Sequence, residues 1–94
     1  MEDSTLLERY VRQHAKGNVL DMGTGSGIQA ITAAHNNNVK SVLALDVQKE
    51  TINYCKKCIK NIKIRFMVSD LFAIFKKKSA LKSKKFDTII FNPP

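Results

Sequence analysis

The sequence lacks the features that would place a protein in or across a membrane. None of its apolar runs approaches the ~18 residues that a membrane span needs. Its first residues, Met1-Glu2-Asp3-Ser4, have neither the basic start nor the apolar stretch of a secretion signal. We therefore expect a cytoplasmic protein with no membrane contact. Its 94 residues suffice for one small domain, residues 1–94.

Cysteine is also scarce, which limits metal and disulfide chemistry. The two cysteines, Cys55 and Cys58, form a single C-x-x-C. A zinc site would need a second pair of ligands, and His14 and His35 stand far away in the sequence without metal-ligand spacing. We expect no metal and interpret both thiols as structural groups in buried or half-buried positions. Redox or metal chemistry is the alternative.

Acidic residues are few in the second half of the chain. Residues 1–48 carry four basic and five acidic residues, whereas residues 49–94 carry twelve basic and three acidic ones. Six lysines fall between Lys76 and Lys85, with no aromatic residue among them. We interpret this segment as a solvated loop. The alternative is a basic patch for RNA or a ribosomal surface that contacts phosphates without base stacking.

Short apolar runs alternate with stretches of helical periodicity. The runs predict strands from residue 19, over 42–45, 62–68 and 86–91, and the periodic stretches predict helices over 28–35 and 49–60. Ser26 is the expected N-cap of the first of these helices. Two apolar stripes are expected on helices: Leu6, Leu7, Tyr10 and Val11 near the N-terminus, and Ile52, Cys55, Ile59 and Ile62 further on.

This alternation of strands and helices predicts an α/β fold with a parallel, doubly wound sheet. Such sheets usually have five to seven strands, and the sequence provides four. The last predicted strand is among the most apolar, as a central strand would be. We therefore expect a fragment of a longer enzyme, or a chain that needs a partner strand at an open sheet edge.

A glycine loop follows the first predicted strand, in the pattern Asp21-x-Gly23-x-Gly25-x-Gly27. Glycine permits positive φ and lets a ligand approach the backbone closely. A dinucleotide site would place its third glycine at position 28, which is Ile28 here. The carboxylate of Asp21 would repel a pyrophosphate, but it suits a ligand with a cationic amino group.

Two further acids end the next two predicted strands. Asp46 stands 25 residues after Asp21, where it is placed to accept hydrogen bonds from two ribose hydroxyls. Asp70 is placed to accept from an exocyclic adenine amine. Each acid alone is also a reasonable helix cap. Together, three acids at the carboxyl ends of successive parallel strands predict an adenosyl cofactor site in the crevice at that edge.

At these residues the sequence resembles the class I S-adenosylmethionine-dependent methyltransferases. The segment from Val19 to Gly27 looks like their first motif, and Asp46 looks like the acid of the second. Ser69-Asp70-Leu71-Phe72 is similar to the third motif and Asn92-Pro93-Pro94 to the fourth. The segment Glu2-Asp3-Ser4 is similar to one that reaches the cofactor in HemK-like glutamine methyltransferases, although it would equally serve as an N-cap box.

The resemblance covers the whole chain and implies a fold, a cofactor and a set of contacts. The fold is the N-terminal half of a Rossmann-like methyltransferase sheet. The cofactor is S-adenosyl-L-methionine, with S-adenosyl-L-homocysteine as product. The implied cofactor contacts are Ser4, Asp21, Gly23, Thr24, Gly25, Asp46, Val47, Asp70, Leu71 and Asn92, and the implied catalytic residues are Asn92, Pro93 and Pro94. The family's motif continues with an aromatic residue (NPPY) beyond the position of Pro94.

The motif Asn92-Pro93-Pro94 also makes chemical sense for methylating a planar nitrogen. An amide or aromatic amino group is a poor nucleophile because its lone pair is delocalised. The Asn92 side-chain oxygen and the Pro93 carbonyl are placed to accept its two hydrogens, which would localise the lone pair and aim it at the methyl group. The prolines fix the main chain and remove competing donors.

Three functions remain open from the sequence. The leading hypothesis is a HemK-like enzyme that methylates a glutamine side chain in a translation release factor. The second is methylation of adenine N6 or guanine N2 in RNA or DNA, for which the Lys76–Lys85 segment would contact the nucleic acid. The third is a non-catalytic fragment that binds a cofactor or a partner such as a small activator protein, or pairs with itself at an open sheet edge.

Overall fold

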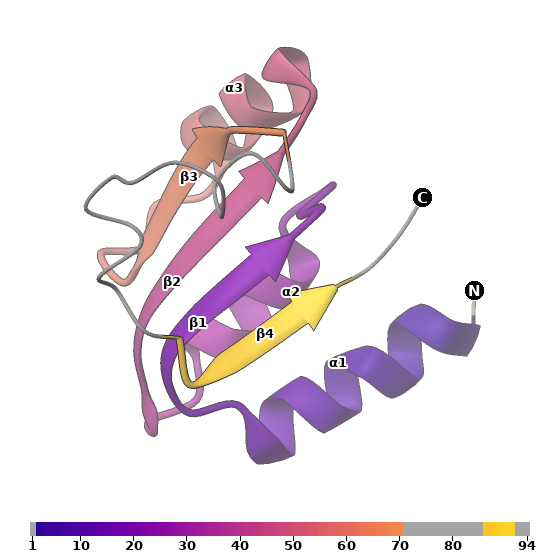
Figure 1. Ribbon diagram of the computed structural model, residues 1–94, viewed down its shortest axis with the longest axis vertical. Helices are drawn as coiled ribbons and strands as arrows, with labels where there is room; N and C mark the ends of the chain where they lie inside the picture. Colours follow the sequence, from indigo (N-terminus) through magenta and orange to yellow (C-terminus); the bar gives the residue numbers. More distant parts are fainter. Residues whose placement is uncertain (1, 71–85, 92–94) are drawn as a thin grey trace.

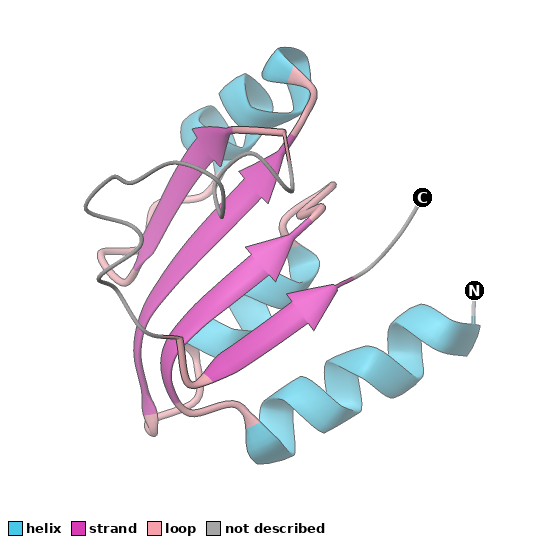
Figure 2. Cartoon of the chain, in the orientation of Figure 1, coloured by secondary structure: helices cyan, strands magenta, loops and turns pink. Residues whose placement is uncertain are grey.

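The computed structural model describes the backbone of residues 2–70 and 86–91, and the side chains within these ranges from residue 5 onward. Three helices and four strands lie in this part of the chain (Figures 1 and 2). They are α1 (Glu2–His14), β1 (Gly17–Met22), α2 (Ile28–Ala34), β2 (Val39–Asp46), α3 (Lys49–Cys58), β3 (Ile64–Val68) and β4 (Thr88–Phe91). None of these helices is long and apolar enough to cross a membrane.

The four strands form one parallel sheet in the order β3-β2-β1-β4. The chain adds β2 and β3 on one side of β1 and then returns to place β4 on the other side. This reversal of strand order is the switch point at which doubly wound sheets bind ligands. The predicted parallel α/β sheet of the Rossmann-like type is therefore confirmed.

Small side chains let the helices lie close to the helix-side face of the sheet, which carries Val19, Asp21, Val42, Ala44 and Ile90. In Figure 1, α2 and α3 lie behind the strands and α1 lies beside β4. Three of the buried residues of α2 are alanines, Ala30, Ala33 and Ala34. The opposite face carries a second buried cluster, Leu20, Met22, Leu43 and Leu45.

The N-terminal helix was predicted with a broader apolar stripe than it has. Val11 is buried and Leu7 packs against the helix-side cluster, as expected. Leu6 and Tyr10 are instead about 60% exposed. Leu7 and Val11 face this cluster, whereas Leu6 and Tyr10 are rotated from them by about 100° around the helix axis. The ring of Tyr10 lies 4.5 Å from that of His14 on this outer side.

Three local predictions around α2 and α3 are wrong. Ser26 does not cap α2, because Gly27 occupies the N-cap position with φ 87° and no side chain caps the helix. The helix α3 ends at Cys58, where Ile59 adopts extended dihedral angles. The apolar stripe therefore stops at Ile59, and Ile62 is fully exposed. Cys58 was predicted to be buried or half-buried and is exposed, whereas Cys55 is fully buried as predicted.

The two outer strands of the described sheet differ from β1 and β2 in burial. On β3, Phe66 is buried while Arg65 and Val68 are exposed, which agrees with the wetter edge that its alternating sequence predicted. On β4, Ile90 is buried, but Ile89 and Phe91 are about half exposed. Among the described strands β4 is at an edge, so its apolar sequence does not correspond to a central position here.

Candidate functional site

The carboxyl ends of β1, β2 and β3 bring the predicted glycine loop and the three acids to one edge of the sheet. Asp21 and Met22 pair with Ala44 and Leu45, and Asp46 pairs with Val68. The backbone N–H groups of the first two loop residues, Gly23 and Thr24, both donate to the carbonyl of Leu45, at 2.9 and 2.8 Å. The loop is therefore fastened to the end of the neighbouring strand.

The glycine loop is a tight turn in which Gly23, Gly25 and Gly27 all have positive φ. Gly25 has φ 55°, which other residues adopt only at a cost. A Cβ atom on Gly25 would have no atom of the described structure within 4 Å, so the loop is open at this point. Gly27 is different, because a Cβ there would collide with the side chain of Ile59.

Asp21 is the most unusual side chain of the site. It is fully buried, with Ala44 and Ile90 beside it on the neighbouring strands. Its Oδ2 accepts a hydrogen bond of 2.8 Å from the hydroxyl of Thr24, whereas Oδ1 is buried with no partner among the described residues. An unpartnered buried carboxylate oxygen is costly, so this site favours a donor or a cation beside it.

The burial of Asp21 also changes its titration. The pKa of this carboxyl is raised to about 6, mainly by the loss of solvation; the Thr24 hydrogen bond partly opposes the rise, and the nearby charge of Asp46 adds to it. A cationic group placed against Oδ1 would reverse this effect by favouring the ionised form.

Asp46 joins the glycine loop to α3. Its Oδ2 accepts from the N–H of Gly25 at 3.1 Å, and its Oδ1 accepts from the N–H of Gln48 at 3.0 Å. Gln48 is the N-cap of α3 and makes no capping bond with its own side chain. Asp46 is half-buried, and each carboxylate oxygen keeps a second lone pair for a ligand hydroxyl.

Two more predicted contacts follow β2 and β3 at the same edge. Val47 comes directly after Asp46 and is 59% exposed. Asp70 comes two residues after the end of β3 and is also exposed. An exposed apolar side chain and an exposed carboxylate at the same edge of the sheet suit a flat heterocycle that carries an amino group.

Several predicted site residues lie outside the described part of the structure. They are Leu71, the Lys76–Lys85 segment, and the catalytic triplet Asn92, Pro93 and Pro94; for Ser4 only the backbone, in α1, is described. The strand before the triplet is described. β4 ends at Phe91, which pairs with Met22 at the edge where the glycine loop begins. The chain thus leaves β4 next to the candidate site.

The sequence alone did not identify Cys55 as part of this site. Its thiol donates to the carbonyl of Gly25, with Sγ 3.3 Å from the oxygen. The C-x-x-C spacing gave no sign of this contact, because the two residues are 30 positions apart and meet only when α3 packs under the loop. A shallow pocket of about 400 Å³ adjoins the same loop and is lined by Gly25, Ser26, Glu50, Thr51 and Tyr54.

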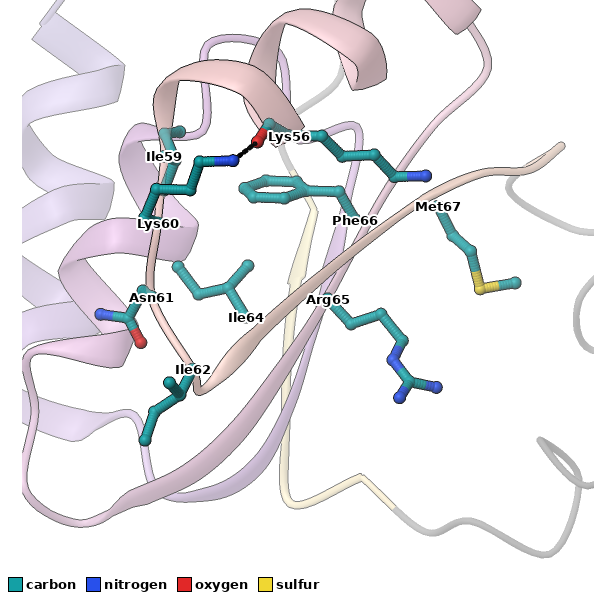
Figure 3. Close-up of a pocket in the computed structure, with 9 residues that line it drawn as sticks. All are labelled: Lys56, Ile59, Lys60, Asn61, Ile62, Ile64, Arg65, Phe66 and Met67. Carbon is teal, nitrogen blue, oxygen red and sulfur yellow. Dashed lines mark hydrogen bonds between the residues drawn. The ribbon is translucent and has the colours of Figure 1, made fainter.

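A second hollow lies away from this edge, along the outer side of β3. This β3 groove has a volume of about 750 Å³ and is lined by Lys56, Ile59, Lys60, Asn61, Ile62, Ile64, Arg65, Phe66 and Met67. Figure 3 shows Ile64 and Phe66 on one side of the strand and Arg65 and Met67 on the other, so the groove follows the strand edge. Three of the lining residues are basic and none is acidic.

Comparison with known proteins places these residues in a family context. The family model of the methyltransferase small domain matches residues 2–94. The release factor glutamine methyltransferase of Bacillus subtilis is 37% identical over 94 residues, which are 95% of this chain and 31% of the relative. The ribosomal RNA small subunit methyltransferase C of a Buchnera aphidicola strain is 33% identical, over 97% of this chain and 25% of the relative. The chain thus spans about a third or less of these two relatives.

Solved structures share the fold. A Thermoplasma acidophilum protein is 32% identical with a TM-score of 0.63, over 95% of this chain and 43% of its own. The M. capricolum protein TrmK, in complex with S-adenosylhomocysteine, has a TM-score of 0.72 at 18% identity, over 92% of this chain and 39% of its own. A protein in complex with the Haloferax volcanii Trm112 methyltransferase activator has a TM-score of 0.60 at 21% identity, over 74% of this chain and 33% of its own.

Proposed function

From the premise that the chain belongs to the methyltransferase small domain family, we propose that it is the cofactor-binding part of an S-adenosylmethionine-dependent N-methyltransferase. The observation that carries the proposal is the buried, unpartnered Oδ1 of Asp21 beside an open glycine loop. That oxygen fits the cationic amino group of a methionine moiety. The whole of residues 1–94 would form this one domain.

The residues at the carboxyl edge match the parts of S-adenosylmethionine. Asp21 would hold the amino group, and the loop around Gly23, Thr24 and Gly25 would lie against the methionine moiety. Asp46 would accept from the ribose hydroxyls, while Val47 and Asp70 would meet the adenine ring and its amine. Ser4, Leu71 and Asn92 complete the proposed set. The bound cofactor supplies a methyl group that its sulfonium charge makes labile, so no metal is needed.

The proposed acceptor is a planar nitrogen, and Asn92, Pro93 and Pro94 are its proposed clamp. Two fixed carbonyl oxygens would accept the two N–H groups and leave the lone pair facing the methyl group. β4 ends beside the glycine loop, which supports a position of the clamp close to the cofactor. Orientation and electrostatics would then account for most of the catalysis.

We favour the glutamine side chain of a translation release factor as the acceptor, because the B. subtilis relative is named for that reaction. A nucleic-acid amino group is the second candidate. It is favoured by the relative named as a ribosomal RNA methyltransferase and by the excess of lysine in residues 76–85. Both acceptors present the same planar N–H₂ group to the clamp.

A methyl-transfer assay on the full-length protein tests this proposal. Transfer of labelled methyl from S-adenosylmethionine would be measured with a release factor and with RNA or DNA as acceptors. The proposal expects transfer to the release factor glutamine. Replacing Asn92 with Ala should lower the transfer rate ~10²–10³-fold and leave cofactor affinity within a few-fold, because Asn92 acts on the acceptor. Cofactor binding without transfer to any acceptor would support the non-catalytic alternative.

We also propose the β3 groove as the docking surface for a small activator protein. Among the described strands β3 pairs only with β2, so one of its edges is open to a strand from a partner. The groove combines apolar side chains with Lys56, Lys60 and Arg65, which suits an extended partner segment that carries acidic residues. Two copies of this chain would set basic residues against each other, which argues against self-pairing through β3.

Binding to a purified Trm112-type activator checks the docking proposal. Ile62 projects from the groove and is fully exposed, so Ile62→Glu should weaken the complex ~10-fold or more without lowering stability. Leu6→Glu, on the exposed side of α1, is the matched control and should have no effect. An Ile62→Glu variant that binds like the wild type would contradict docking at β3.

A further inference from the structure

The backbone of Gly25 is held from two sides. Its N–H donates to Asp46 Oδ2 at 3.1 Å, and its carbonyl accepts from Cys55 Sγ at 3.3 Å. The first contact comes from the end of β2 and the second from α3. On its outer side Gly25 has no packing, since a Cβ there would meet no described atom within 4 Å. The two bonds act on different peptide units. The Thr24–Gly25 unit is also held by the N–H of Gly27, which donates to the Thr24 carbonyl at 2.9 Å, whereas the Gly25–Ser26 unit is held by the bond from Cys55.

The thiol that makes the second bond is itself fixed. Cys55 is fully buried and belongs to the helix-side cluster with Ile52 and Phe66. Its Sγ would lie 3.5 Å from a Cβ placed on Gly27, so it fills the space directly beneath the loop. Burial raises the pKa of this thiol, which keeps the S–H group protonated and able to donate near neutral pH.

We propose that Cys55 is a positioning residue of the cofactor site: its thiol holds the Gly25 carbonyl and so keeps the glycine loop in its binding conformation before the cofactor arrives. The inference rests on the proposed function, because it assigns the loop to a cofactor. A loop that is already ordered loses less conformational freedom on binding, and the saved entropy increases affinity. Cys55 touches neither the cofactor nor the acceptor in this scheme.

A volume-filling cysteine and a positioning cysteine differ in their response to substitution. Cys55→Val keeps an apolar side chain beneath the loop but removes the donor. Cys55→Ser is smaller and keeps a donor for Gly25. If only volume mattered, Val would be the better replacement. If the hydrogen bond matters, Ser would be the better one.

Two measurements on the full-length protein separate these cases. Calorimetry with S-adenosylhomocysteine should show affinity ~3- to 10-fold weaker for Cys55→Val and within ~2-fold of wild type for Cys55→Ser, as expected for one hydrogen bond. The carbon-13 shift of the Gly25 carbonyl, measured without cofactor, should move upfield in the Val variant and not in the Ser variant. Cys58→Val, at an exposed position of the same helix, should change neither quantity.

Opposite results would overturn the inference. A Val variant with wild-type affinity and an unchanged Gly25 carbonyl shift would show that the thiol only fills space. A Ser variant that binds S-adenosylhomocysteine as weakly as the Val variant, at equal thermal stability, would also show that the thiol only fills space. Absence of S-adenosylhomocysteine binding by the wild type would defeat the proposed function, and the carbonyl shift would still decide the role of Cys55.

Discussion

Both ends of β1 have a glycine with positive φ and an aspartate, but the two pairs differ in their surroundings. At its amino end, Gly17 has φ 65° and faces the carboxylate of Asp87, whose Oδ2 accepts from the N–H of Asn18 at 2.8 Å. Past its carboxyl end, Gly25 has φ 55° and faces open space, and the buried Asp21 has an unpartnered oxygen. At the amino end the polar groups bind one another, whereas at the carboxyl end an open glycine and a buried, unpartnered carboxylate oxygen leave room for a ligand.

The largest expected difference concerns the two glycines. Gly17→Ala should lower the free energy of unfolding by about 3 kcal/mol, because its Cβ would overlap the Asp87 carboxylate as well as straining φ. Gly25→Ala should cost only about 1 kcal/mol of stability, since its Cβ has room. It should instead weaken S-adenosylhomocysteine binding at least ~10-fold. Chemical denaturation and calorimetry provide both values, and equal losses of stability would remove the distinction.

The two aspartates provide the next comparison. Asp21→Asn should weaken cofactor binding by about 1.5–3 kcal/mol, because a charge-assisted bond to the amino group is lost. It should not lower stability, since it removes a buried charge with an unsatisfied oxygen. Asp87→Asn should do the reverse, costing about 1 kcal/mol of stability and leaving affinity unchanged. A loss of stability without a loss of affinity in Asp21→Asn would contradict the assignment.

Asp46 is expected to combine both roles. Asp46→Ala removes the proposed ribose contact and the two hydrogen bonds that the carboxylate accepts from the backbone N–H groups of Gly25 and Gln48. Cofactor affinity should fall by about 1–3 kcal/mol and stability by about 1 kcal/mol. Unchanged affinity in a folded variant, measured by calorimetry, would take Asp46 out of the site.

The smallest expected effect is a change of about tenfold in cofactor affinity with pH. The folded, unliganded protein raises the pKa of Asp21 to about 6, so the carboxyl is mostly protonated at pH 5 and mostly ionised at pH 7.5. An ammonium ligand needs the ionised form, so affinity should increase as the pH rises through 6, by about tenfold in total. The stability changes in the opposite direction: because the ordinary pKa of the carboxyl is 3.8, the free energy of unfolding should fall as the pH rises from about 4 to about 6 and should level off above that. Asp21→Asn should have a flat affinity profile.

The sequence was enough to predict those parts of the site whose position depends only on the order and direction of the strands. The glycine spacing after an apolar strand predicted the left-handed loop, and the acids ending successive strands predicted the shared edge, because parallel strands carry their carboxyl ends to the same side. Their roles toward a cofactor remain predictions. The strand order β3-β2-β1-β4 was not predicted, because four parallel strands are compatible with more than one order.

What the sequence did not predict depends on contacts between distant residues. The Cys55–Gly25 bond requires α3 to lie beneath the loop, and the Gly17–Asp87 contact joins the start of β1 to the residue before β4. Element ends were missed for a related reason. β2 begins at Val39 rather than at residue 42: Lys40 and Ser41 interrupt the apolar run, but Val39 and Ser41 still pair with Gly17 and Asn18 of β1.

The central claim is that Asp21 is left incomplete for the amino group of S-adenosylmethionine or its product. Titration calorimetry at pH 6 with S-adenosylhomocysteine, in two buffers of different ionisation enthalpy, tests it directly. A carboxyl with a pKa of about 6 is half protonated there, so binding should release about half a proton per cofactor, and Asp21→Asn should release none. Binding without proton release by the wild type, or equal release by both proteins, would contradict the claim.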